Sequence, residues 1–112
     1  MKKVVITFSH PPQGTSHFSE GLRLASGMAL SNHETSLVFT GNGAFCSLKN
    51  IDQTDRALFW KTIAEFNYPI FVEKESLEKR KISFQDIDPK FKVISRNEVS
   101  EILLHCDIHL GV

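Results

Sequence analysis

Short apolar runs alternate along this chain with longer amphipathic stretches, which is the pattern of strands connected by helices. The apolar runs predict strands at Lys3–Phe8, Thr35–Thr40, Ile70–Val72, Phe91–Ile94 and Asp107–Val112. Stretches with apolar residues at helical spacing predict helices at Phe18–Ser31, Asp55–Asn67 and Glu98–Cys106. Since strands and helices alternate throughout, we expect an α/β fold. It would have about five mostly parallel strands with helices on both faces, formed by residues 1–112 as a single domain.

The loop after the first predicted strand is a candidate site. Ser9–His17 contains two prolines and a glycine, so neither a strand nor a helix continues through it. The helix that begins near Phe18 directs unpaired backbone N–H groups at this loop, and ligands of open α/β sheets tend to bind at such places. The histidines of the loop are either acid–base or anion-binding groups or ordinary solvated turn residues. The candidate binding residues of the loop are His10, Gln13, Gly14 and Thr15.

A second candidate loop follows the second predicted strand. Gly41, Asn42 and Gly43 predict a tight turn, and all three are candidate binding positions. The next residues, 44–48, predict a short helix with Cys46 in its first turn. A thiol there would have a lowered pKa, because the positive end of a helix dipole favours the thiolate. Alternatively, Cys46 packs inward beside Phe45 as a small apolar side chain, and both interpretations stay open.

Two further segments carry polar signals. Glu73–Lys81 is dense in charges of both signs and predicts one or two solvated helical turns, with pairs such as Glu75 and Lys79. Residues 83–90 predict a loop. Ser95 or Asn97 is expected to cap the last helix.

Composition excludes several classes of function. Thirteen basic and thirteen acidic residues give a formal net charge of zero, so direct nucleic-acid binding is not expected. No apolar run approaches the roughly 20 residues of a membrane span, and the first strand is too short for a signal peptide, so we expect a cytoplasmic protein. Cys46 and Cys106 lack metal-ligand spacing, and we expect no metal and no cofactor. Nine phenylalanines indicate an aromatic core, part of which could serve a subunit interface.

Four stretches together have the order and spacing of a known family. They are Ser9–Ser16 with Glu20–Leu22, Val38–Phe45, Ile70–Arg80 and Cys106–Leu110. The first resembles a proline-and-glycine loop with a Glu-Gly-Leu helix start, and the second a strand followed by a glycine turn. The third is similar to a strand followed by Ser-Leu-x-x-Arg. In this order they resemble the DsrE/DsrF-like family, which includes the TusB, TusC and TusD sulfur-relay proteins, with most similarity to its TusC/DsrF branch.

The resemblance implies a supporting role in sulfur transfer. Sulfur-carrying members of the family place a cysteine directly after the third strand, where this chain has Glu73. A carboxylate cannot hold a persulfide, and Lys81 replaces the glycine that usually follows the arginine. The resemblance therefore implies a non-carrier subunit in tRNA 2-thiolation or sulfur oxidation. It also implies a homo- or hetero-oligomer with cysteine-bearing DsrE/TusD-like and DsrH/TusB-like partners, and makes Glu73 part of the candidate pocket.

Two other functions remain alternatives to this role. The chain could be a self-sufficient sulfur carrier that uses Cys46 as its catalytic thiol. It could instead be a small-ligand-binding module that uses the first loop and residues 41–43. We expect a non-catalytic subunit of a sulfurtransferase complex rather than an enzyme that acts by itself.

Overall fold

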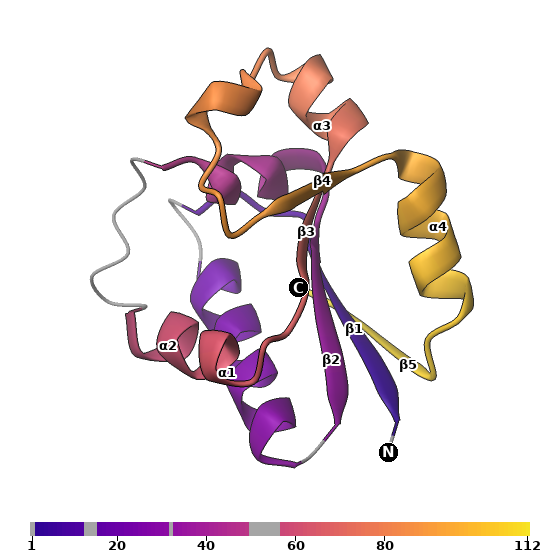
Figure 1. The fold of residues 1–112 in the computed structure, drawn as a ribbon. Coiled ribbons are helices and arrows are strands. Elements are labelled where there is room, and N and C mark those ends of the chain that lie inside the picture. The colour runs from indigo at the N-terminus through magenta and orange to yellow at the C-terminus, as the bar shows by residue number, and fades with distance from the viewer. Residues whose placement is uncertain (1, 13–15, 32, 50–56) are drawn as a thin grey trace.

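The computed structural model describes residues 2–12, 16–31, 33–49 and 57–112. Their strands form a sheet in which every neighbouring pair is parallel, in the order β4-β3-β2-β1-β5. The strands are β1 (Lys3–Phe8), β2 (Glu34–Phe39), β3 (Ile70–Glu73), β4 (Lys92–Ile94) and β5 (Ile108–Gly111). Figure 1 shows α1 (His17–Leu30) and α2 (Ala57–Glu65) on one face and α4 (Arg96–Leu104) on the other. The expected α/β fold with helices on both faces is confirmed.

Among the described residues, three short helical elements connect the strands. The 3-10 helix η1 (Gly41–Ser47) follows β2, the α-helix α3 (Lys74–Lys79) follows β3, and the 3-10 helix η3 (Phe84–Asp86) precedes β4. Since the strands are parallel, η1 and α3 begin at the same edge of the sheet, the carboxyl edge. Figure 1 shows them together above the ends of β2 and β3.

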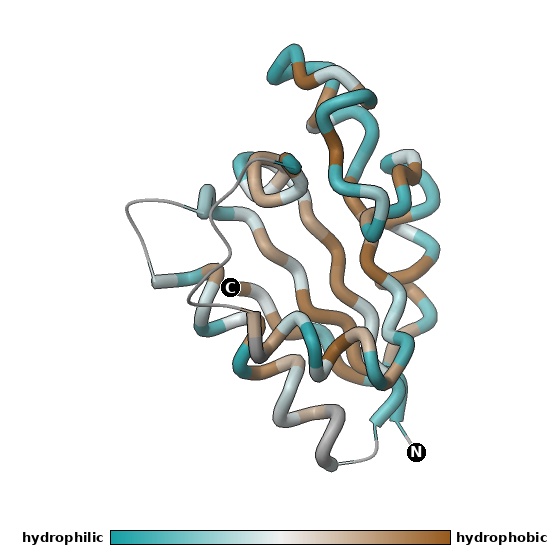
Figure 2. The backbone as a smooth tube through the Cα atoms, turned by 60° about the vertical axis from the view of Figure 1, so that its left-hand side comes forward, coloured by the Kyte–Doolittle hydropathy of each residue, from teal (hydrophilic) through white to brown (hydrophobic). Residues whose placement is uncertain are grey.

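Side chains of each strand alternate between two apolar cores, one on each face. In Figure 2 the strands are largely brown and lie between helices that carry both colours. The core under α1 and α2 is the larger one, and at its centre the rings of Phe8 and Phe39 stack with centroids 4.2 Å apart. Four of the nine phenylalanines are buried in it, at positions 8, 18, 39 and 91. The core under α4 is built around Val5, Val38, Ile94 and Val99.

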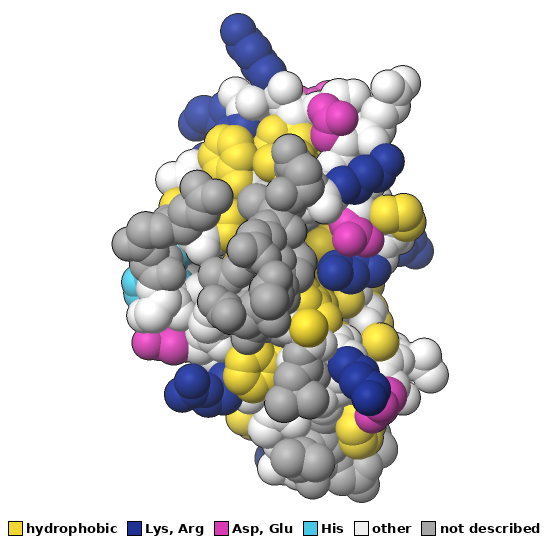
Figure 3. Space-filling model, turned by 90° about the vertical axis from the view of Figure 1, so that its left-hand side faces the viewer, with side chains coloured by type: hydrophobic (Ala, Val, Ile, Leu, Met, Phe, Trp, Pro, Cys, Tyr) yellow, Lys and Arg dark blue, Asp and Glu magenta, His cyan; other side chains and the backbone are white. Residues whose placement is uncertain are grey.

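Trp60 connects α2 to the larger core. Its ring meets Phe18 and Phe91 edge-on, with centroids 6.0 and 5.9 Å away. Lys90 Nζ lies 4.2 Å from the centroid of the same ring, at cation–π distance. Seen from this side of the molecule, apolar side chains alternate with lysine, arginine and carboxylate groups (Figure 3).

The tight turn predicted at residues 41–43 is present, with Gly43 N–H donating to the backbone oxygen of Thr40 at 2.9 Å, but it is continuous with the short helix predicted after it. Gly41 has φ of +55° and already starts η1, which continues to Ser47. Gly43 lies so close to β1 that a Cβ atom would overlap the carbonyl oxygen of Phe8. Glycines at both positions therefore allow η1 to begin directly at the end of β2. As a result Cys46 is the sixth residue of η1 and does not lie in the first turn of a helix.

The prediction of a solvated segment at residues 73–81 is only partly right. Lys74, Glu78 and Lys79 are exposed, but Glu73, Ser76 and Leu77 are buried. Leu77 belongs to the larger core, and this anchor draws the first turn of α3 against the sheet. The density of charged residues in the sequence did not indicate that one side of this short helix is buried.

The remaining elements differ from the predictions mainly at their ends. The helix expected at 55–67 appears as α2, with residues 55 and 56 outside the described residues. The loop expected at 83–90 contains η3. Ser95, one of the two expected caps, accepts a hydrogen bond from Glu98 N and forms a capping box with Glu98, so α4 begins at Arg96. Within the part of the chain that the structure describes, no helix is long and apolar enough to cross a membrane.

Candidate functional site

Glu73 lies at the carboxyl edge of the sheet, where β3 ends and α3 begins. It belongs to the strand positions that face the α4 side, as Phe71 does, whereas Ile70 and Val72 face the larger core. Only 7% of the residue's surface is exposed. A carboxylate at this depth requires polar partners, because leaving water without them costs several kcal/mol.

The hydroxyl of Ser76 supplies the shortest of these contacts. Ser76 Oγ donates a hydrogen bond of 2.6 Å to Glu73 Oε1 and accepts one of 2.9 Å from Gly41 N. Ser76 is itself buried. This one side chain therefore ties the end of β3 and the first turn of α3 to the start of η1.

Arg96 supplies the positive charge. Its Nη2 atom lies 3.5 Å from Glu73 Oε1, and its backbone N–H donates to Glu75 Oε1 at 2.8 Å. Glu75 thus caps the start of α4, where the sequence suggested a pair with Lys79. The side chain of Arg96 is 64% exposed, so the ion pair is largely solvated and contributes little to stability. Its guanidinium still places a positive charge at the rim of the carboxyl edge.

Arg80 joins η1 to the end of α3. Its Nε donates to Asn42 Oδ1 at 3.1 Å and its Nη1 donates to the backbone oxygen of Ser76 at 3.2 Å. The residues connected in this way form what we call the Glu73 cluster: Gly41, Asn42, Glu73, Ser76, Arg80 and Arg96.

The structure brings together part of the set proposed from the sequence. Gly41, Asn42 and Glu73 meet in the Glu73 cluster, while Gly43 packs below it against β1. Sequence reasoning missed Ser76, Arg80 and Arg96 as site residues. The Ser-Leu-x-x-Arg stretch carried a signal for the first two. No sequence pattern pointed to Arg96, because this residue lies at the start of α4, which follows β4 in the chain.

The first loop forms a separate group. The rings of His10 and His17 stack with centroids 3.9 Å apart, and His10 Nδ1 lies 3.5 Å from Ser9 Oγ. Gln13, Gly14 and Thr15 lie outside the described residues. Among the described residues, the imidazole of His10 contacts Ser9 and His17. The proposal that His10 lines the same pocket stays a prediction.

The environment of Cys46 matches inward packing. The residue is fully buried in the larger core, and its Sγ lies 3.6 Å from the backbone oxygen of His10. Cys46 is the sixth residue of η1 and so lies outside the first turn in which the sequence placed it, and its role as a reactive thiol stays a prediction. Cys106, at the other end of the molecule, is half-buried and donates to the backbone oxygen of Leu103 at 3.2 Å. Across the described residues, no group of three or more His, Cys, Asp and Glu side chains could hold a metal ion.

Comparison with known proteins identifies the family. The model of the DsrE/DsrF-like family matches residues 2–111. This chain belongs to the DsrE/DsrF-like family. A relative, Protein TusC of Buchnera aphidicola subsp. Baizongia pistaciae (strain Bp), is 36% identical over 86 residues, which cover 71% of this chain and 72% of the relative. The crystal structure of the ychN protein from E. coli matches with a TM-score of 0.86 over 100% of both chains at 20% identity, which shows the same fold.

The family match and the TusC relative confirm the resemblance drawn from the sequence. They support the role of a sulfur-relay subunit, and they suggest a complex with other subunits of such a relay.

Proposed function

We propose that this chain is a non-carrier subunit of a cytoplasmic sulfur-relay complex. It assists persulfide transfer by a cysteine-bearing subunit of the DsrE/TusD-like type, alongside a DsrH/TusB-like subunit. The observation that carries the proposal is Glu73, the last residue of β3, which stands at the position where the family resemblance places the cysteine of sulfur-carrying members. The relay serves either tRNA 2-thiolation or sulfur oxidation.

The chemistry of sulfur transfer excludes Glu73 as a carrier. In each step a thiolate attacks the terminal sulfur of a persulfide, one S–S bond forms and another breaks, and the donor leaves as a thiolate. The exchange needs no oxidant, but it needs a thiol on both sides. Glu73 offers carboxylate oxygens, and one of them is occupied by Ser76 and Arg96.

The Glu73 cluster suits a supporting role. Its hydrogen bonds fix η1, α3 and the start of α4 relative to one another, which gives the carboxyl edge a defined shape. The exposed guanidinium of Arg96 adds a positive charge there. A partner's persulfide is an anion near neutral pH, so a positive rim at a shared edge would favour its approach.

Intact-mass measurement after treatment with a persulfide donor tests the proposal. When the chain is mixed with a cysteine-bearing family subunit, we expect the partner to gain about 32 Da, the mass of one sulfur atom, and this chain to gain none. A double variant, Cys46→Ser with Cys106→Ser, should support transfer by the partner as well as the unmodified chain does.

One result would overturn the non-carrier role. It is a stable persulfide on the isolated chain, at Cys46 or Cys106, that forms as fast as the complex turns over. A partner whose transfer rate is the same with and without this chain would also contradict the proposal.

A further inference from the structure

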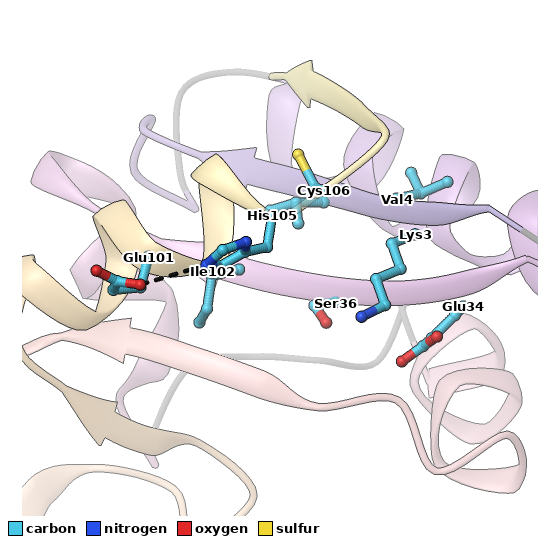
Figure 4. Close-up of a pocket in the computed structure, with 9 residues that line it drawn as sticks. Lys3, Val4, Glu34, Ser36, Glu101, Ile102, His105 and Cys106 are labelled. Carbon is cyan, nitrogen blue, oxygen red and sulfur yellow. Dashed lines mark ion pairs between the residues drawn. The ribbon is translucent and has the colours of Figure 1, made fainter.

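A hollow of about 300 Å³ lies on the α4 side of the sheet, at the amino ends of β1 and β2 and therefore far from Glu73. We call it the α4 groove. Figure 4 shows residues of α4 and the segment after it on one side and strand residues on the other. Sites for small molecules have volumes of roughly 300–1,000 Å³, so the α4 groove has the size for a small ligand.

Three polar side chains of the strand wall are available to a ligand. Lys3 and Glu34 are partners in the β1–β2 register, and Ser36 lies two residues further along β2, on the same face of the sheet. Among the residues that the structure describes, none makes a hydrogen bond or an ion pair with any of these three side chains. Figure 4 shows them on the side of the sheet that faces α4. An ammonium, a carboxylate and a hydroxyl group therefore line one wall without a protein partner.

The helix wall offers apolar surface rather than available charges. Its polar side chains, Glu101 and His105, are partners of each other, with His105 Nε2 3.4 Å from Glu101 Oε2. The apolar side chain of Ile102 lines the groove from the same helix and is half-buried, and Val5 lines it from β1. An apolar group of a ligand that contacted Ile102 and Val5 would be removed from water, which favours binding.

The charges of the strand wall select the kind of ligand. A ligand of one sign would be attracted by one of Lys3 and Glu34 and repelled by the other, whereas a zwitterion satisfies both. In a free α-amino acid the ammonium and carboxylate groups are bonded to the same carbon atom. That short separation suits charges carried by paired residues of two neighbouring strands, which lie about 4.8 Å apart.

We propose that the α4 groove binds a free α-amino acid with an aliphatic side chain. Lys3 Nζ and Ser36 Oγ donate to the ligand's carboxylate, and the Glu34 carboxylate accepts from its ammonium group. Ile102 and Val5 contact its side chain. The inference goes beyond the proposed function, because it concerns the other end of the sheet and requires neither a thiol nor a partner subunit.

NMR titration of the full chain with L-leucine tests the site. We expect saturable shifts at residues of the α4 groove and a dissociation constant of roughly 0.1–1 mM, since the ligand is small and its polar partners are largely exposed. Glycine, which has no side chain to contact Ile102, should bind at least about fivefold more weakly. N-acetyl-L-leucine lacks the ammonium group and L-leucinamide lacks the carboxylate, so each should bind at least about fivefold more weakly than L-leucine.

Two variants assign the two ends of the ligand. Lys3→Met should weaken the binding of L-leucine at least about fivefold and leave that of L-leucinamide unchanged, because the amide has no carboxylate for Lys3 to bind. Glu34→Gln should weaken L-leucine similarly and leave N-acetyl-L-leucine unchanged. Lys2→Met is the matched control, since Lys2 is an exposed lysine outside the lining of the groove, and it should keep the unmodified affinity. Circular dichroism establishes that the variants are folded.

Several results would overturn the proposal. One is the absence of saturable L-leucine binding up to about 10 mM, and another is a set of shifts that leaves the α4 groove unaffected. Derivatives that bind as tightly as L-leucine would show that the ligand is not recognised as a zwitterion. An equal loss of affinity in Lys3→Met and Lys2→Met would show that the protein's overall charge, rather than Lys3, attracts the carboxylate.

Discussion

Ser76 is the residue on which the geometry of the Glu73 cluster depends most. Its hydroxyl accepts from Gly41 N and donates to Glu73, so it serves a backbone donor and a buried carboxylate at once. The sequence indicated Gly41 and Asn42 through the glycine turn after a predicted strand, and the family resemblance indicated Glu73. Neither indicated Arg96, since no local pattern shows which residue of a later helix meets the end of β3.

Ser76→Ala is expected to lower the free energy of unfolding by about 1–3 kcal/mol, because Gly41 N–H and the Glu73 carboxylate both lose a buried partner. Urea unfolding followed by circular dichroism measures this change. Ser100→Ala, at an exposed position of α4, is the control and should change stability by less than about 0.5 kcal/mol. Equal stability of the Ser76→Ala and unmodified chains would show that the hydroxyl is dispensable.

The sequence predicted helices and strands well where their apolar pattern is long. It predicted them poorly where contacts with residues distant in the chain determine the conformation or the burial of a segment. The periodicity of α1 and α4 and the apolar runs of β1 and β2 are properties of the segments themselves. The nature of η1 depends instead on its fit against Phe8, and the burial of α3 depends on Leu77 reaching the larger core. Neither contact has a local signature.

Alanine substitutions of two glycines within helical elements should change the stability of the chain in opposite directions. Gly43→Ala should destabilise the chain by about 1–3 kcal/mol, since the new methyl group overlaps the Phe8 carbonyl oxygen. Gly27→Ala, in the interior of α1, should stabilise it by about 0.5–1 kcal/mol, because the added Cβ meets nothing within 4 Å and reduces the freedom of the unfolded chain. Thermal and urea unfolding report both changes. A tolerated Gly43→Ala would contradict the close approach of η1 to β1.

The start of α4 offers a second prediction at this scale. Ser95→Ala should cost about 1 kcal/mol, because the capping box loses its hydroxyl. Asn97→Ala, at the other cap position that the sequence allowed, should change stability by less than about 0.5 kcal/mol. Comparison of the two urea midpoints checks the assignment, and a larger loss in Asn97→Ala would reverse it.

At the scale of the whole molecule, one sheet separates two cores of unequal size. The alternation of elements predicted the parallel sheet with covered faces, because right-handed crossovers leave few other arrangements. It did not predict how unequally the faces are covered, with α1 and α2 on one side and α4 on the other (Figure 1). The faces differ because β4 and β5 lie at opposite edges of the sheet, so the chain must cross the sheet between them. Among the described helices, α4 alone lies in that connection.

The two cores should contribute unequally to one cooperative transition. Leu22→Ala, in the larger core, should cost about 3 kcal/mol or more, and Val99→Ala, in the smaller core, about 2 kcal/mol. Both variants should unfold in a single urea transition with an unchanged slope, since the same strands form the floor of both cores. Two resolved transitions in either variant would show that the faces unfold independently.

The position of Trp60 gives this protein a built-in optical probe. It is the single tryptophan of the chain and lies in the larger core between Phe18 and Phe91. Its emission therefore reports the loosening of α2 from the sheet without any label. Because the sheet stands between this indole and α4, a change confined to α4 should leave the spectrum unchanged, so the emission distinguishes events on the two faces of the sheet.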